Sequence, residues 1–135
     1  MAEEKVHIVT GIILAAITLP FGAGPAYAVF FGALFPDIDV LFKGWHRSWI
    51  THTAFVPALL SYSTAFFPSL DWLSALLPFF AFGIVVHVIL DFWDYEKFKG
   101  TRIPFNPKLS DKWPEWPTLI TVLIPQIPFL FYGMI

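Results

Sequence analysis

The chain has 135 residues, of which 57% are hydrophobic and only 13% are charged. A soluble domain carries roughly 25% charged residues, and a chain of this size has too little interior for so much apolar surface, so the composition excludes disorder and favours a small integral membrane protein. The net charge of −2 excludes a basic field that would attract nucleic acid, and the absence of cysteine excludes disulfides and thiolate ligands.

Stretches without Asp, Glu, Lys or Arg indicate the helices, because a membrane-spanning helix needs about 20 mostly apolar residues. The first stretch, Val6–Pro36, is too long for one helix and contains the turn-forming segment Pro20–Pro25, so it predicts a short N-terminal hairpin. The predicted helices are Glu4–Leu19, Pro25–Phe35, Trp49–Phe67, Trp72–Trp93 and Thr118–Met134. The sequence thus predicts an all-α fold, an integral membrane helical bundle of about five transmembrane helices in a single domain.

Charged residues are distributed asymmetrically over this predicted bundle. The five crossings place the start of the chain, residues 37–48 and residues 94–116 on one side, which with the adjoining helix ends holds all eight basic residues. Asp71 is the only charged residue on the opposite side. The positive-inside rule therefore predicts an inner or plasma membrane protein with its N-terminus in the cytoplasm and its C-terminus outside.

The cytoplasmic side also collects all four histidines and most of the aspartates. A dense cluster of buried acids would repel itself without a cation, so this convergence predicts a metal site. Its clearest element is the pair His87 and Asp91, because residues four apart stack on one helix face and form a half-site for Zn²⁺ or Mn²⁺. The alternative for this pair is a hydrogen bond that marks the membrane boundary.

Two further segments carry candidate site residues. Asp37 and Asp39 follow the second predicted helix, where an Asp-x-Asp pair can bind a hard cation or bridge two, although solvated loop acids have the same pattern. At the start of the third helix, His46 can converge with His52 if it lies in the loop. Arg47 between them suits recognition of a phosphate or carboxylate, or snorkels at the interface.

The N-terminal helix contributes one more histidine. His7 lies one turn before Gly11, a small residue that would let another helix approach closely. The alternative is an incidental histidine near a terminus.

Three segments, Leu34–Asp39, His46–Thr53 and His87–Asp91, together resemble the YdjM-like membrane-bound metal-dependent hydrolases. The pattern of that family is similar to a Pro-Asp-x-Asp-His stretch, a His-Arg-Gly-x-Thr-His-Ser stretch and a later His-x-x-x-Asp, in the order found here, and His7 with Gly11 matches its N-terminal histidine and glycine. Val40 stands where the family usually has histidine, and Ser48 replaces glycine. The resemblance implies hydrolase activity.

The leading hypothesis is therefore a metal-dependent hydrolase at the cytoplasmic membrane face, acting on a lipid or lipid-linked phosphoester. Arg47 would bind the substrate anion, and His46 or Asp94 would orient a ligand or transfer a proton. The cofactor would be one or two divalent ions, Zn²⁺ first and Mn²⁺ or Mg²⁺ as alternatives, and the partners would be membrane lipid and a phosphate-bearing substrate. The expected metal ligands are His7, Asp37, Asp39, His52, His87 and Asp91.

Two alternatives remain open from the sequence. One is a metal-ion permease or a metal-binding membrane module without hydrolytic activity, although the histidines gather at one face rather than along a conducting path. The other is a structural subunit whose metal only pins the helices together.

Overall fold

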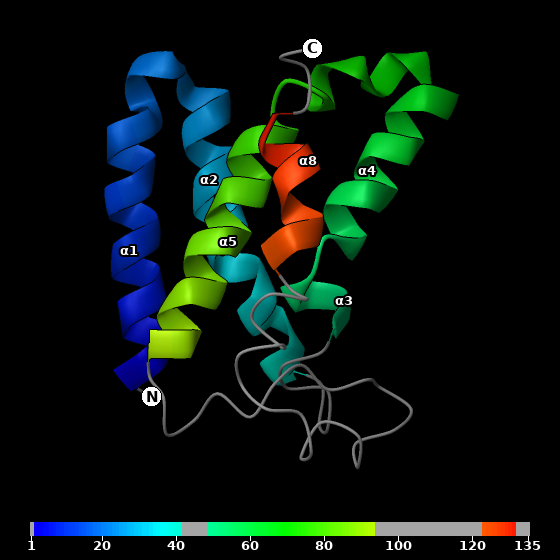
Figure 1. Ribbon diagram of the computed structural model, residues 1–135. Helices are drawn as coiled ribbons and strands as arrows, with labels where there is room; N and C mark the ends of the chain where they lie inside the picture. The colour runs from blue at the N-terminus through cyan, green and yellow to red at the C-terminus, as the bar shows by residue number, and fades with distance from the viewer. Residues whose placement is uncertain (1, 42–48, 94–122, 132–135) are drawn as a thin grey trace.

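The computed structural model describes residues 2–41, 49–93 and 123–131, and the elements within these ranges are helical (Figure 1). The predicted all-α class is therefore confirmed. Short 3₁₀ helices, labelled η, alternate with the α-helices. In chain order the elements are α1 (Ala2–Thr18), η1 (Leu19–Phe21), α2 (Ala23–Leu34), η2 (Phe35–Leu41), α3 (Trp49–His52), α4 (Phe55–Phe66), η3 (Pro68–Leu73), α5 (Leu77–Trp93), η4 (Ile124–Gln126) and α8 (Ile127–Leu130).

The predicted N-terminal hairpin is present, with α1 and α2 side by side (Figure 1). The Thr18 hydroxyl donates to the Leu14 carbonyl at 2.8 Å, and the chain turns through η1 to Gly22. Gly22 has φ of 120°, a conformation that residues with a Cβ rarely adopt. α2 starts two residues before the predicted position, because Pro25 in its first turn gives up only an N–H that has no intrahelical acceptor.

Helices α2 and α5 cross with their backbones in contact, and this crossing forms the core. A Cβ at Gly32 would overlap the Phe80 carbonyl oxygen, and a Cβ at Gly83 would lie 2.6 Å from the Ala33 amide nitrogen. Only glycine permits so close an approach. The buried apolar side chains around the crossing are Val29, Ala33, Leu77, Ala81, Ile84 and Val88.

Prolines divide the three later predicted helices. Pro57 lacks an N–H, and its ring excludes the carbonyl four residues earlier. The predicted helix Trp49–Phe67 is therefore split into α3 and α4, with Thr53 and Ala54 between them. Pro78 likewise shortens the predicted helix Trp72–Trp93, because α5 begins at Leu77. In the described part of the last predicted helix, two prolines leave only η4 and α8.

The predicted membrane-spanning architecture is wrong. The longest described helices, α1 and α5, have 17 residues each, fewer than the roughly 20 that span a bilayer. Among the described residues, no helix combines the length and the apolar character that a membrane crossing requires. Prolines and 3₁₀ turns interrupt the charge-free stretches, which hydropathy alone does not register. This finding overturns both the bundle of about five transmembrane helices and the integral membrane localisation with its cytoplasmic and outer sides.

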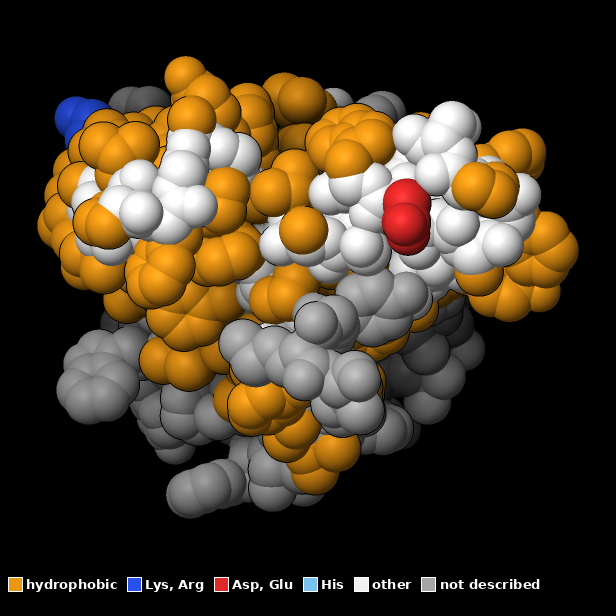
Figure 2. Space-filling model, turned by 90° about the horizontal axis from the view of Figure 1, so that it is seen from above, with side chains coloured by type: hydrophobic (Ala, Val, Ile, Leu, Met, Phe, Trp, Pro, Cys, Tyr) orange, Lys and Arg blue, Asp and Glu red, His pale blue; other side chains and the backbone are white. Residues whose placement is uncertain are grey.

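The alternating direction of the helices nevertheless agrees with the predicted order. The start of α1, η2, α3 and the end of α5 gather at one end of the bundle, and η1 and η3 lie at the other (Figure 1). Seen from that second end, the described side chains at the surface are mainly hydrophobic (Figure 2). Asp71 on η3 is exposed there. The bundle therefore separates Asp71 from the three histidines that the structure describes, His7, His52 and His87.

Candidate metal centre

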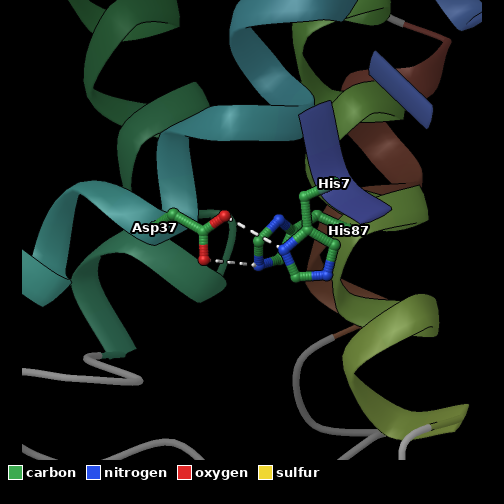
Figure 3. A group of neighbouring side chains, drawn as sticks. All are labelled: His7, Asp37 and His87. Carbon is green, nitrogen blue, oxygen red and sulfur yellow. Dashed lines mark hydrogen bonds and ion pairs between the residues drawn. The ribbon is translucent and has the colours of Figure 1, made fainter. Parts of the chain in front are cut away.

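Five of the predicted ligands come together at the first end of the bundle. His7 lies on α1, Asp37 on η2 just beyond α2, His52 at the end of α3, and His87 and Asp91 on the last turns of α5. Four of them are buried, and Asp37 is half-buried. Figure 3 shows His7, Asp37 and His87 pointing toward one another from three separate elements. The i, i+4 pairing of His87 and Asp91 is as predicted.

His87 is fixed in one orientation by the neighbouring helix. Its Nδ1 lies 2.7 Å from the carbonyl oxygen of Ala33, across the α2–α5 crossing. A carbonyl oxygen can only accept a hydrogen bond, so Nδ1 carries the hydrogen and donates it. In the neutral imidazole the single available lone pair is then on Nε2.

The local sequence explains why this carbonyl accepts from a distant side chain. The chain changes from α to 3₁₀ winding at Phe35, and in a 3₁₀ helix the carbonyl of Ala33 would accept from residue 36. Residue 36 is proline, which has no N–H to donate. The Ala33 carbonyl therefore receives its hydrogen bond from His87, 54 positions away.

The second nitrogen of His87, Nε2, is the atom of the cluster that most clearly indicates a place for a cation. Nε2 is buried and, among the described residues, has no hydrogen-bond partner. Two carboxylate oxygens face it, Asp91 Oδ2 at 3.6 Å and Asp37 Oδ1 at 3.8 Å. A lone pair facing two carboxylates is an unfavourable arrangement of acceptors, and a cation placed between them makes it favourable.

The distances from His87 Nε2 to the two carboxylate oxygens fit a pair of ligands on one ion better than a hydrogen bond. Protein N–H···O hydrogen bonds are about 2.7–3.2 Å long, shorter than both separations. Ligand atoms 2.0–2.1 Å from a tetrahedral Zn²⁺ lie about 3.4 Å apart. His52 Nε2 is likewise 3.6 Å from Asp91 Oδ2. The ligand atoms of His52, His87 and Asp91 lie within 4.8 Å of one another, so these three side chains can surround a common centre, and Asp37 Oδ1 faces the same nitrogen of His87.

His7 lies between the two carboxylates. Its Nδ1 is 3.0 Å from Asp37 Oδ2, and its Nε2 is 3.3 Å from Asp91 Oδ1. The ring also lies against His87, with centroids 3.9 Å apart. The contact with Asp37 confirms that the α1–α2 hairpin brings His7 and Asp37 to the same end of the bundle. His7 could bind an ion only by releasing one of these carboxylates, so its present contacts hold the two acids in place.

Two possible ligand triads are present among the described residues, and they overlap. One contains His7, Asp37 and His87, and the other contains His52, His87 and Asp91. Because Nδ1 of His87 is committed to Ala33, both triads depend on the same nitrogen, and one nitrogen lone pair binds one ion. These residues therefore offer one centre for an ion rather than two independent ones.

The charges at the centre are also suited to a divalent ion. Two carboxylates face the three imidazoles, and Lys5 is the only basic side chain that the structure describes outside the histidines. Lys5 is exposed. An ion of charge +2 would balance both acids, whereas an imidazole balances a carboxylate only when it is protonated.

Several predicted site residues are not tested by this geometry. The backbone of Asp39 belongs to η2, but its side chain lies outside the described part of the chain, as does that of Val40. His46, Arg47 and Asp94 also lie outside the described residues.

Sequence reasoning missed two groups that contact the site histidines. One is the Ala33 carbonyl, and the other is the Thr51 hydroxyl, 3.0 Å from His52 Nδ1. The position of Thr51 directly before a candidate ligand could have indicated a role. The Ala33 contact depends on the helix crossing, for which Gly32 and Gly83 were the only signal.

Comparison of the chain with protein-family models, with curated proteins and with solved structures finds no match. The resemblance to the YdjM-like hydrolases therefore rests on the sequence motifs alone and stays a prediction.

Proposed function

We propose that this chain is a metal-dependent hydrolase whose divalent ion is held by His52, His87, Asp91 and Asp37. The observation that carries the proposal is the buried Nε2 of His87, which faces two carboxylates at 3.6 and 3.8 Å and, in the described part of the chain, has no hydrogen-bond partner. Mixed histidine and carboxylate ligands are typical of Zn²⁺ and Mn²⁺ centres. Zn²⁺ is the first candidate.

The burial of the ligands indicates from which direction a substrate would approach. The side chain of Asp37 is 25% exposed, compared with 0% for His87 and 9% for Asp91. The centre is therefore open beside Asp37 and closed on the side of α5. A bound ion would supply Lewis acidity, polarising a phosphoryl or carbonyl oxygen and acidifying a water molecule. His7 keeps both carboxylates turned toward the centre.

A phosphate ester is the proposed substrate class. The motif resemblance implies a hydrolase, and Arg47 follows His46 in one of the motifs that carry it. The planar guanidinium suits bidentate binding of a phosphate. In this proposal Arg47 binds the substrate anion and the charge that develops on it.

One observation favours a second function, that of a structural metal centre. The ligands come from η2, α3 and α5, and three of the four are almost fully buried. Structural zinc sites are closed by protein ligands, whereas catalytic sites keep one position open. The two functions differ in whether the half-exposed Asp37 leaves such a position.

The deciding experiment measures metal and turnover on the same purified full-length chain. Metal content would be determined by mass spectrometry after dialysis, and hydrolysis would be followed with p-nitrophenyl phosphate and bis(p-nitrophenyl) phosphate in the presence of Zn²⁺, Mn²⁺ or Mg²⁺. We expect bound metal and turnover, both lost in His87→Ala. Arg47→Gln should keep the metal and lose turnover. Bound metal without turnover of either ester would support the structural function, and a chain without metal would refute both.

A further inference from the structure

His52 extends toward the proposed metal centre from a very short helix. It is the last residue of α3, a helix of four residues, yet its side chain is 2% exposed. One helical turn fixes the backbone but does not fix the rotation of an imidazole ring or the position of its hydrogen. A separate contact must hold the ring if Nε2 is to face Asp91.

The neighbouring residue makes that contact. The hydroxyl oxygen of Thr51 lies 3.0 Å from Nδ1 of His52, and both side chains are buried. A threonine hydroxyl can donate or accept, so this distance alone is compatible with either neutral tautomer. The proposed metal centre decides between them: Nε2 faces Asp91 Oδ2 at 3.6 Å, and an ion held between these two atoms needs the lone pair of Nε2, which leaves the hydrogen on Nδ1.

His87 shows the same arrangement with an unambiguous direction. Its Nδ1 must donate to the Ala33 carbonyl, which leaves the Nε2 lone pair facing Asp91 Oδ2, also at 3.6 Å. The two histidines thus approach the same carboxylate oxygen with equivalent nitrogens. For both to bind one ion, both must carry hydrogen on Nδ1, and for His52 the group that accepts it is Thr51.

We propose that Thr51 is a positioning residue, whose hydroxyl accepts a hydrogen bond from Nδ1 of His52 and so holds the Nε2 lone pair toward the metal centre. The inference rests on the proposed metal centre. Ligand histidines commonly donate their second N–H to such a partner, and loss of that partner typically weakens metal binding by about 10–100-fold. Thr51 would therefore set metal affinity without touching the ion.

The first test compares three substitutions by isothermal titration of metal-free protein with Zn²⁺. Thr51→Val keeps the shape and removes the hydroxyl, and it should raise the Kd by about 10–100-fold. Thr51→Ser keeps the hydroxyl and should stay close to wild type. Thr64→Val is the matched control, because Thr64 is also buried and bonds only within α4, to the Ser61 carbonyl, among the contacts the structure gives. Thr64→Val should leave the Kd unchanged, while it lowers the free energy of unfolding about as much as Thr51→Val does.

The second test needs no metal and separates this inference from the proposed function. Long-range ¹H–¹⁵N spectra of histidine-labelled metal-free protein report which ring nitrogen carries hydrogen, and His52→Asn assigns the signal. We expect the Nδ1–H tautomer in wild type and in Thr51→Ser, and an increase of the Nε2–H tautomer in Thr51→Val. A wild-type His52 with hydrogen on Nε2, or a Thr51→Val protein with wild-type Kd, would overturn the inference. If wild type binds no Zn²⁺, the proposed function fails, and the spectra still decide the role of Thr51.

Discussion

Nε2 of His87 and Oδ2 of Asp91 lie 3.6 Å apart, one helical turn from each other on α5. A boundary hydrogen bond, the alternative left open by the sequence, would require a shorter distance and a hydrogen on Nε2. The Ala33 carbonyl already takes the hydrogen of the neutral ring. The geometry therefore does not fit a boundary hydrogen bond, and in the proposed metal centre the two residues supply two ligands.

The first prediction concerns this pair. His87→Ala and Asp91→Asn should each lower the Zn²⁺ content of purified protein at least tenfold, since each removes a ligand that faces the other ligands of the centre. Metal content by mass spectrometry checks this. Asp71→Asn is the control, because Asp71 is an exposed acid at the opposite end of the bundle, and it should change nothing.

The second prediction concerns stoichiometry. Because both ligand triads share Nε2 of His87, the described residues should hold one ion, and His87→Ala should abolish that binding rather than halve it. Titration calorimetry gives the number of ions bound by the wild type and by the variant. Two equivalent ions in wild type and one in His87→Ala would show that the triads are independent.

The sequence predicted which histidines and aspartates lie together better than it predicted the fold around them. The i, i+4 spacing of His87 and Asp91 needs only a helix, and the Pro20–Pro25 turn was enough to bring His7 to Asp37. The membrane prediction failed because hydropathy counts side chains and ignores main-chain donors. Pro57 and Pro78 removed those donors, and the helices they interrupt are shorter than the apolar stretches that contain them.

The third prediction concerns stability. An ion that joins η2, α3 and α5 binds only the folded chain, and at a free concentration of 100 times its Kd it would add about 2.7 kcal/mol to the free energy of unfolding. A strong chelator should therefore lower the melting temperature by about 10 °C, and added Zn²⁺ should restore it. The same treatment of His87→Ala should have no effect. An equal response in the variant would mean that the chelator acts elsewhere.

The fourth prediction concerns the crossing of α2 and α5. Gly83→Ala places a methyl group against the α2 backbone, including the Ala33 amide nitrogen at 2.6 Å, and should destabilise the fold by about 1–3 kcal/mol. It should also weaken Zn²⁺ binding, because the Ala33 carbonyl that orients His87 must move. Gly24→Ala is the matched control: its Cβ would meet only the tip of the Leu76 side chain, which can turn away. Denaturant unfolding and Zn²⁺ titration measure both effects.

The fifth prediction concerns Pro36. Pro36→Ala supplies an N–H that can compete with His87 for the Ala33 carbonyl, so the Kd for Zn²⁺ should rise about tenfold while the helix content by circular dichroism is maintained. Pro20→Ala, an exposed proline in η1, should leave binding unchanged. Wild-type affinity in Pro36→Ala would show that Ala33 holds His87 without the help of the proline.

The hydrogen bond between Ala33 and His87 also has a consequence for how the chain folds. Its partners are 54 positions apart, and the histidine that donates to this carbonyl lies outside the α1–α2 hairpin. In a fragment that stops before α5, the last turn of α2 would have to bind water or fray. The last turn of α2 is thus completed only when α5 docks against it. The long segment between the two helices must close before this turn becomes ordered. Assembly of the ligand cluster and completion of α2 would then belong to a single cooperative step.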